Sequence, residues 1–128
     1  MTLQIFKTEV FLKSSKKMGI PDKTLLRIAD EISGGNRGDK IGECLYKKRI
    51  PRTGGGKSGG YRTLVTYQEG ERLLFIFVYE RKDANKIKEV LEKDDIKALA
   101  LYGLGILRMT EKEISDNLKK GFLEEILK

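Results

Sequence analysis

The residues best suited to chemistry are cations concentrated between residues 43 and 62. This segment holds six lysines and arginines and one carboxylate, a net charge of +5, whereas the whole 128-residue chain carries +7. The six cations are Lys47, Lys48, Arg49, Arg52, Lys57 and Arg62. Glycines at 54–56 and 59–60 would let backbone N–H groups approach a phosphate. A positive field focused on so short a stretch predicts a surface that meets a polyanion.

The residue types that are missing narrow the chemistry further. The chain has no histidine and a single cysteine, Cys44. The usual Cys/His zinc sites and the Ser-His-Asp or Cys-His arrangements are therefore excluded. Catalysis would have to use lysine, arginine, tyrosine, serine or carboxylates, and we expect neither a metal nor a cofactor.

The sequence Gly56-Lys57-Ser58 resembles the end of a P-loop, but two requirements of that motif fail. Pro51 stands where the motif needs its first glycine, and a strand rather than a helix is predicted to follow. The residues alone leave two alternatives, a hairpin loop without a ligand and a loop that meets nucleic-acid phosphates.

Several of these side chains also have a plain structural explanation. The cations at 47–49 are compatible with a solvated edge strand, where lysines prevent aggregation. Tyr61 and Tyr79 are compatible with the core or with stacking on an unpaired base. Arg62 differs because it alternates with Leu64, so a cation lies in register with core residues. That placement is costly unless the cation has a partner or a function.

The elements that must position these residues follow from the hydrophobic pattern. It predicts the order β-α-α-β-β-β-α-α, an α+β fold whose small, mainly antiparallel sheet carries two N-terminal helices and additional C-terminal helices. Thr8 is suited to cap a helix through about Met18, and Pro21 to begin a second helix that stops at Gly34. The expected strands are 3–6, 44–50, 61–67 and 73–79.

The remainder of the chain is predicted to be helical. Thr110–Glu113 has the pattern of a capping box for a helix through about Lys120, and 122–127 reads as a short amphipathic end. We expect one domain, residues 1–128, with 110–128 as a helical C-terminal extension.

The cellular setting can also be anticipated. No run of about 18 apolar residues exists, which predicts no membrane span. The first residues lack a secretory leader pattern, and one cysteine cannot form an intrachain disulfide. We expect a cytoplasmic protein.

Three segments carry a resemblance to a known family. They are the basic strand Lys47-Lys48-Arg49, the stretch Gly56–Thr63 (GKSGGYRT), and Phe75–Tyr79 followed by Arg81. In these the chain resembles the RelE/ParE superfamily of type II toxins, in the RelE-like (HigB-like) branch with a GKSGGYRT core. The likeness runs from Phe6 to about Leu118, and Glu80 stands where this branch commonly has a small residue.

The resemblance implies a messenger-RNA endonuclease that acts in the ribosomal A site. Its partner would be an antitoxin, expected to be a helix-turn-helix DNA-binding protein, and the pair would repress its own operon. Alternatives on the same sequence are a ParE-like toxin that inhibits DNA gyrase and a non-catalytic RNA-binding module.

The RNA 2′-hydroxyl would be the nucleophile in such a reaction, and the chain would supply cations instead of imidazole. We assign stabilisation of the phosphorane to Arg62, with Arg49 or Arg81 assisting. Lys57 or Lys48 would be the base if neighbouring cations lower its pKa, and Tyr79 would stack on a base or donate a proton. The remaining residues expected to contact RNA are Lys47, Arg52, Ser58, Tyr61 and Lys82.

Overall fold

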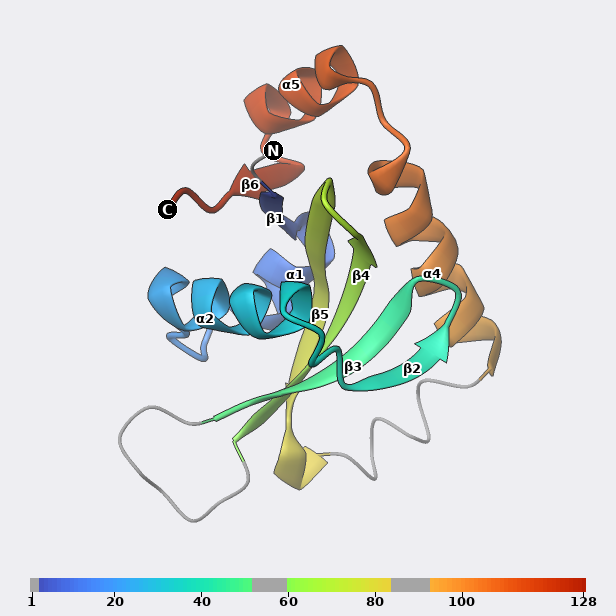
Figure 1. The fold of residues 1–128 in the computed structure, drawn as a ribbon. Coiled ribbons are helices and arrows are strands. Elements are labelled where there is room, and N and C mark those ends of the chain that lie inside the picture. Colours follow the sequence, from blue (N-terminus) through green and yellow to red (C-terminus); the bar gives the residue numbers. More distant parts are fainter. Residues whose placement is uncertain (1–2, 52–59, 84–92) are drawn as a thin grey trace.

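The fold was determined as a computed structural model that describes residues 3–51, 60–83 and 93–128. Its central feature is one six-stranded sheet with the strand order β2-β3-β4-β5-β1-β6 (Figure 1). The pair β1–β5 is parallel, and the other neighbouring pairs are antiparallel. The strands are β1 (Gln4–Thr8), β2 (Asp39–Gly42), β3 (Leu45–Ile50), β4 (Tyr61–Gln68), β5 (Arg72–Glu80) and β6 (Leu123–Glu125). The predicted α+β class with a mainly antiparallel sheet is confirmed.

Two N-terminal helices lie against one face of this sheet, as predicted. Helix α1 (Glu9–Ser14) begins at the expected cap, where Thr8 Oγ1 accepts a hydrogen bond of 3.2 Å from the Phe11 N–H. It ends at Ser14, short of the predicted Met18, and turns lead to α2 (Asp22–Ser33). Buried residues of both helices form one core with strand residues such as Ile50 and Phe75.

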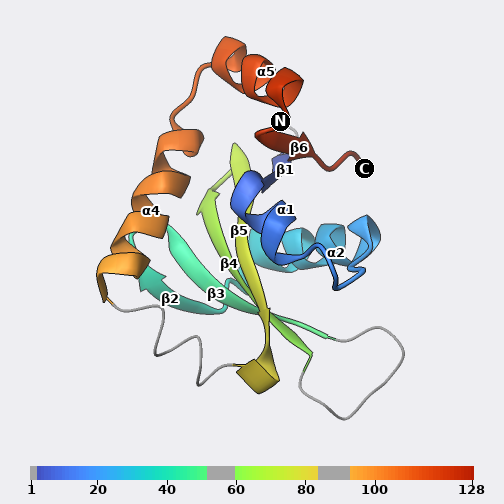
Figure 2. The ribbon, with the colours of Figure 1, turned by 180° about the vertical axis from the view of Figure 1, so that it is seen from behind.

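The opposite face is covered by α4 (Lys93–Leu107), as Figures 1 and 2 show from two sides. Its residues join Leu45, Leu64 and Ile76 in a second core. Gly103 permits this packing, because a Cβ there would lie 2.3 Å from the Thr66 methyl group.

The C-terminal part contains one element that the sequence pattern did not predict. Helix α5 (Glu111–Lys120) has the expected capping box, with Thr110 and Glu113 bonded reciprocally. Residues 123–125, however, form β6 beside β1 instead of a helical end. Three consecutive residues are too few for a periodicity to distinguish strand from helix, and pairing with β1 decides the outcome.

A second unpredicted strand is β2, in the segment read as a polar connection. It pairs with β3, and Asp39 lies opposite Lys47. Cys44, predicted as part of a strand, lies in the turn between β2 and β3 with a φ of 57°. The segment is polar and lacks the alternation of apolar and polar residues that indicates a strand. It forms the edge of the sheet, so it is paired on one side only.

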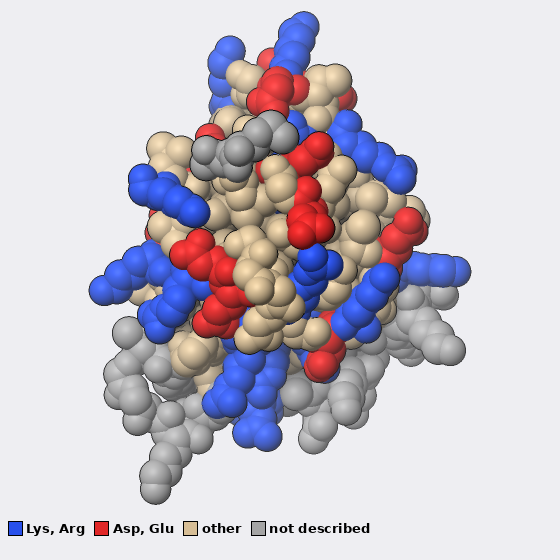
Figure 3. All heavy atoms as spheres, in the orientation of Figure 1, with Lys and Arg blue, Asp and Glu red and all other residues tan. Residues whose placement is uncertain are grey.

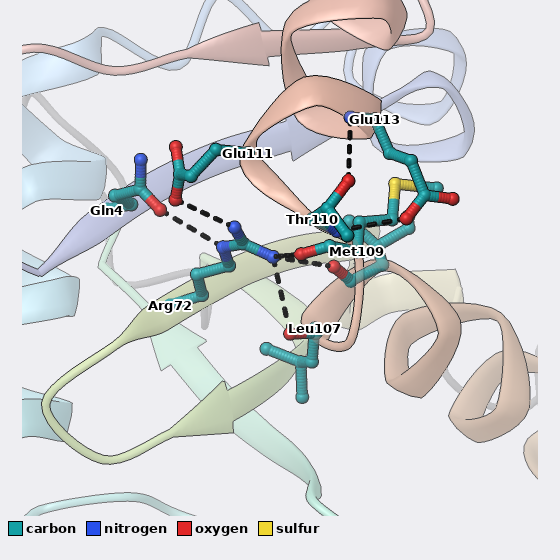
Figure 4. A network of polar contacts seen from close by, with 8 residues as sticks. Gln4, Arg72, Leu107, Met109, Thr110, Glu111 and Glu113 are labelled. Carbon is teal, nitrogen blue, oxygen red and sulfur yellow. Dashed lines mark hydrogen bonds and ion pairs between the residues drawn. The ribbon is translucent and has the colours of Figure 1, made fainter.

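A buried arginine joins the C-terminal helices to the sheet (Figure 4). The Arg72 side chain is 8% exposed and donates to the carbonyl oxygens of Ile106, Leu107 and Met109 at 3.3, 3.3 and 2.6 Å. It also donates to Gln4 Oε1 and Glu111 Oε1, each at 3.0 Å. One guanidinium therefore supplies a charged donor to carbonyl groups at and just beyond the end of α4, where a helix runs out of backbone donors of its own.

Candidate nucleic-acid interface

Three of the predicted site residues come from neighbouring positions on three adjacent strands. Arg49 of β3 lies opposite Arg62 of β4, and Arg62 lies opposite Tyr79 of β5. Alternation along β3 and β4 places both arginines on the sheet face of Leu45 and Leu64, the face that α4 covers farther along. We call this set the Arg49–Arg62–Tyr79 row.

An irregularity in β5 is what brings Tyr79 to this face. Leu64 lies opposite Phe77 but Val65 lies opposite Phe75, so Ile76 is an extra residue in the ladder. Ile76 and Phe77 consequently pack into the same core although they are consecutive. Without this bulge, alternation from Leu74 and Ile76 would send Tyr79 to the other face.

The row next to it provides an apolar floor and one more cation. Lys47, Leu64 and Phe77 lie opposite one another in the same three strands. The Phe77 and Tyr79 rings are 6.1 Å apart between centroids, a tilted contact. Aromatic contacts of this kind fix the orientation of the phenol. Lys47 is half-buried, and Arg49 is exposed.

The phenol of Tyr79 is electrostatically distinct. Burial raises its pKa above the ordinary value of 10.0, and the positive charge of Arg62 offsets part of that rise. Tyr79 is therefore a proton donor throughout the neutral pH range. The guanidinium of Arg62 also donates to the carbonyl oxygen of Tyr61 at 3.2 Å, which anchors one end of its fork.

The structure does not bring Lys48 to this row. Lys48 alternates with Arg49 and lies on the opposite face, where its side chain is only 7% exposed. Its Nζ forms an ion pair of 2.9 Å with Glu31 Oε1 of α2. The Lys48 ammonium is therefore buried, paired and on the face opposite to Arg62. Lys48 therefore does not belong to the Arg49–Arg62–Tyr79 row.

Tyr61 also lies on the far face. It is half-buried, packs against the α1–α2 core and its hydroxyl donates to the Met18 carbonyl oxygen at 3.5 Å. Glu80 lies opposite Tyr61 in the ladder. Tyr79 and Glu80 are successive residues of β5, and their side chains thus lie on opposite faces of the sheet.

Two further predicted cations follow directly after β5. Arg81 and Lys82 are exposed in the 3₁₀ turn η1 (Arg81–Asp83). The Arg81 N–H donates to the Gly60 carbonyl oxygen at 3.1 Å, which ties this turn to the start of β4. Figure 3 shows basic side chains protruding at the same lower end of the molecule where η1 lies in Figure 1. Arg52, Lys57 and Ser58 lie outside the described residues.

Sequence reasoning missed Phe77 as the floor beneath Tyr79. Its only signal was its place in the apolar run 73–79, which does not say which face each residue serves. Within the described residues, no group of three or more histidine, cysteine or carboxylate side chains is placed to hold a metal ion. The described helices include none with the length and apolarity needed to cross a membrane.

Fold and row together define a small α+β protein with a cationic site at one end of its sheet. Comparison with protein families adds the particular family: the model of the RelE toxin of the RelE / RelB toxin-antitoxin system matches residues 3–126. The chain belongs to the RelE toxin family. No curated protein matched the sequence significantly.

Proposed function

We propose that this toxin is a ribosome-dependent endoribonuclease that cleaves messenger RNA in the A site. The observation that carries the proposal is the Arg49–Arg62–Tyr79 row, in which two arginines and a protonated tyrosine occupy directly opposed positions of three adjacent strands. Such a set can neutralise a phosphate and deliver a proton without imidazole.

The chemical step is attack of the RNA 2′-oxygen on the adjacent phosphorus. The O2′–P bond forms, the P–O5′ bond breaks, and the 2′-proton passes to a base. Arg62 and Arg49 stabilise the additional negative charge of the phosphorane, and each well-placed donor contributes about 3–4 kcal/mol. Tyr79 gives its proton to the leaving 5′-oxygen. The products are a 2′,3′-cyclic phosphate and a 5′-hydroxyl.

Lys57 is the base that the proposal retains, because Lys48 is engaged with Glu31 on the other face. An unshifted lysine is almost fully protonated at pH 7. The ribosome would therefore supply part of the rate by holding the 2′-oxygen in line with the scissile bond. The remaining predicted cations, Lys47, Arg52, Arg81 and Lys82, and the Ser58 hydroxyl would bind the RNA backbone.

The partner we propose is an antitoxin with a helix-turn-helix domain, placed with the toxin in the cytoplasm. Charge complementarity to the basic row would speed its capture of the toxin. The GKSGGYRT segment further favours the HigB-like branch of the family. A neighbouring gene that encodes a small helix-turn-helix protein would support this partner.

The test is to add purified protein to translating ribosomes and to map the ends of the message. We expect cleavage in the A site with cyclic phosphate ends, which distinguishes 2′-hydroxyl attack from metal-assisted hydrolysis to 3′-hydroxyl ends. Arg62→Ala should abolish cleavage while the thermal unfolding midpoint stays near that of the wild type. Intact message together with DNA breaks would instead identify a gyrase inhibitor.

A further inference from the structure

A second group of cations lines a hollow on the other side of the sheet. This hollow has a volume of about 430 Å³ and is formed where the end of α1 and the following turn meet the end of β5. Its polar lining residues are Lys13, Ser14, Lys16, Lys17, Glu80 and Lys82. We call it the lysine hollow.

The charge of the lysine hollow is strongly positive. Lys13 pairs with Glu9 at 3.1 Å and Lys82 with Glu80 at 3.1 Å. Lys16 and Lys17 are exposed, and neither forms an ion pair with the residues that the structure describes. Two ammonium groups therefore stay available to an external anion.

The base of the hollow is held in place by the sheet. Ser14 Oγ accepts a hydrogen bond of 3.2 Å from the Val78 N–H, which fixes the end of α1 on β5. The Tyr61 hydroxyl donates to the Met18 carbonyl oxygen and holds the turn after α1. A ligand could therefore bind in the hollow without a rearrangement of the protein backbone.

One strand end connects the lysine hollow to the Arg49–Arg62–Tyr79 row. Tyr79 belongs to the row, and the next residue, Glu80, lines the hollow from the opposite face. A long polyanion that reached around the end of β5 would meet cations on both sides of the sheet.

The lining chemistry favours a phosphate backbone over a protein partner. Lysines act as flexible point charges suited to phosphates. The centres of protein interfaces are instead depleted in lysine and enriched in aromatic residues. Met18 is the one apolar side chain that lines the hollow within the described part of the chain.

We infer that the lysine hollow is a second docking surface for RNA phosphates, which grips ribosomal RNA while the row acts on the message. This inference deepens the proposed function and rests on it for the identity of the RNA. Lys16 and Lys17 are positioning residues: they contribute to the affinity for the ribosome and not to the chemical step.

The experiment compares Lys16→Gln/Lys17→Gln with the control Lys119→Gln/Lys120→Gln. The control removes two adjacent, exposed lysines from the end of α5, at the opposite end of the molecule from η1 (Figures 1 and 2). Affinity for message-programmed 70S ribosomes is measured over a range of salt concentrations, and kcat and KM of message cleavage are measured in parallel. Polyglutamate serves as a probe for an acidic protein partner.

We expect the slope of log affinity against log salt to become about 1.5 shallower for the Lys16/Lys17 variant, because two phosphate contacts are lost. KM should rise while kcat is unchanged, and the control should behave as the wild type. A slope equal to that of the control would overturn the inference. The inference would also be overturned if the Lys16/Lys17 variant bound polyglutamate more weakly than the wild type but bound ribosomes equally well. That result would indicate an acidic protein partner.

The two proposals can fail separately. Suppose that the salt-dependence slopes of wild type and Lys16/Lys17 variant differ as expected, but that the wild type cuts no message. The lysine hollow would then be supported as an RNA-docking surface. That result would reject only the nuclease activity.

Discussion

Arg62 and Tyr79 lie directly opposite each other in the β4–β5 ladder, and the charge of the guanidinium acts on the phenol. Burial raises the pKa of Tyr79, whereas Arg62 alone would lower it. The pair therefore combines a permanent cation with a neutral proton donor. These are the two groups that a departing 5′-oxygen and a phosphorane would require.

Tyr79→Phe should reduce kcat by about 100-fold, a typical contribution of a general acid, with little change in KM. The activity attributable to Tyr79 should be lost at a higher pH than for an ordinary phenol, because burial raises the pKa of Tyr79 above 10.0. Rates are measured in single-turnover assays on programmed ribosomes. An increase in KM with unchanged kcat would contradict proton donation and indicate that the ring stacks on a base.

Arg62→Lys should be nearly as inactive as Arg62→Ala, with a loss of about 100-fold in kcat or more, because an ammonium cannot reproduce the planar fork. The matched control is Lys82→Arg, which exchanges the same two residue types at an exposed position that we assign to RNA binding only. Full activity of Arg62→Lys would favour the non-catalytic RNA-binding alternative.

Glu31→Gln should lower the free energy of unfolding by about 1–2 kcal/mol, because the ammonium of Lys48 then stays buried without its carboxylate. The effect is smaller than for a fully buried pair, since Glu31 is 41% exposed. Adding Lys48→Met should recover most of the loss in denaturant unfolding. The double variant should also retain cleavage, because Lys48 faces away from Arg62; loss of kcat in folded protein would restore Lys48 as a base.

Arg72→Met should lower the free energy of unfolding by about 3 kcal/mol, because the carbonyl groups at the end of α4 lose a charged donor. Arg72→Lys should recover little, since one ammonium cannot reach the acceptors on both sides of the fork. Arg108→Met is the control, an exposed arginine of the same region. Equal stability of the two methionine variants would show that the network in Figure 4 contributes nothing.

Lys7 connects β1 to two other elements and predicts a loss of stability at high pH. Burial lowers the pKa of Lys7, but hydrogen bonds and charges from Asp22 and Glu124 outweigh it and raise the pKa above 10.5. Both ion pairs are 2.9 Å long. Because the folded pKa is raised, this stabilisation is complete below pH 10.5 and disappears as the pH rises through the folded value.

The measurement is the unfolding free energy of wild type and Lys7→Met from pH 8 to 11.5. We expect a difference of about 1 kcal/mol at pH 8, small because both carboxylates are about half exposed, and a narrowing difference above pH 10.5. A difference that stays constant across this range would mean that packing of the side chain matters instead of its charge.

Elements with strong local signals were predictable. The caps at Thr8 and Thr110 form as expected, and the strands that became β3, β4 and β5 lie within two residues of their predicted bounds. The strands β2 and β6 were not predictable, because each is short and is stabilised by pairing with another strand. The partner of β6 is distant in sequence, and the partner of β2 follows across a tight turn. Local propensity is weak evidence for such edge strands.

The amino-acid sequence by itself determined which chemistry is open to this protein: a concentration of lysine and arginine, no histidine, and glycines next to the cations. Only the tertiary structure decided which of those cations lie close together. The bulge at Ile76 turns Tyr79 toward Arg62, and alternation along β3 puts Lys48 on the opposite face, where Glu31 pairs with it. The physical reason is that the face a strand residue occupies depends on register with neighbouring strands and on charges brought close by folding, neither of which is encoded in the residue's immediate surroundings.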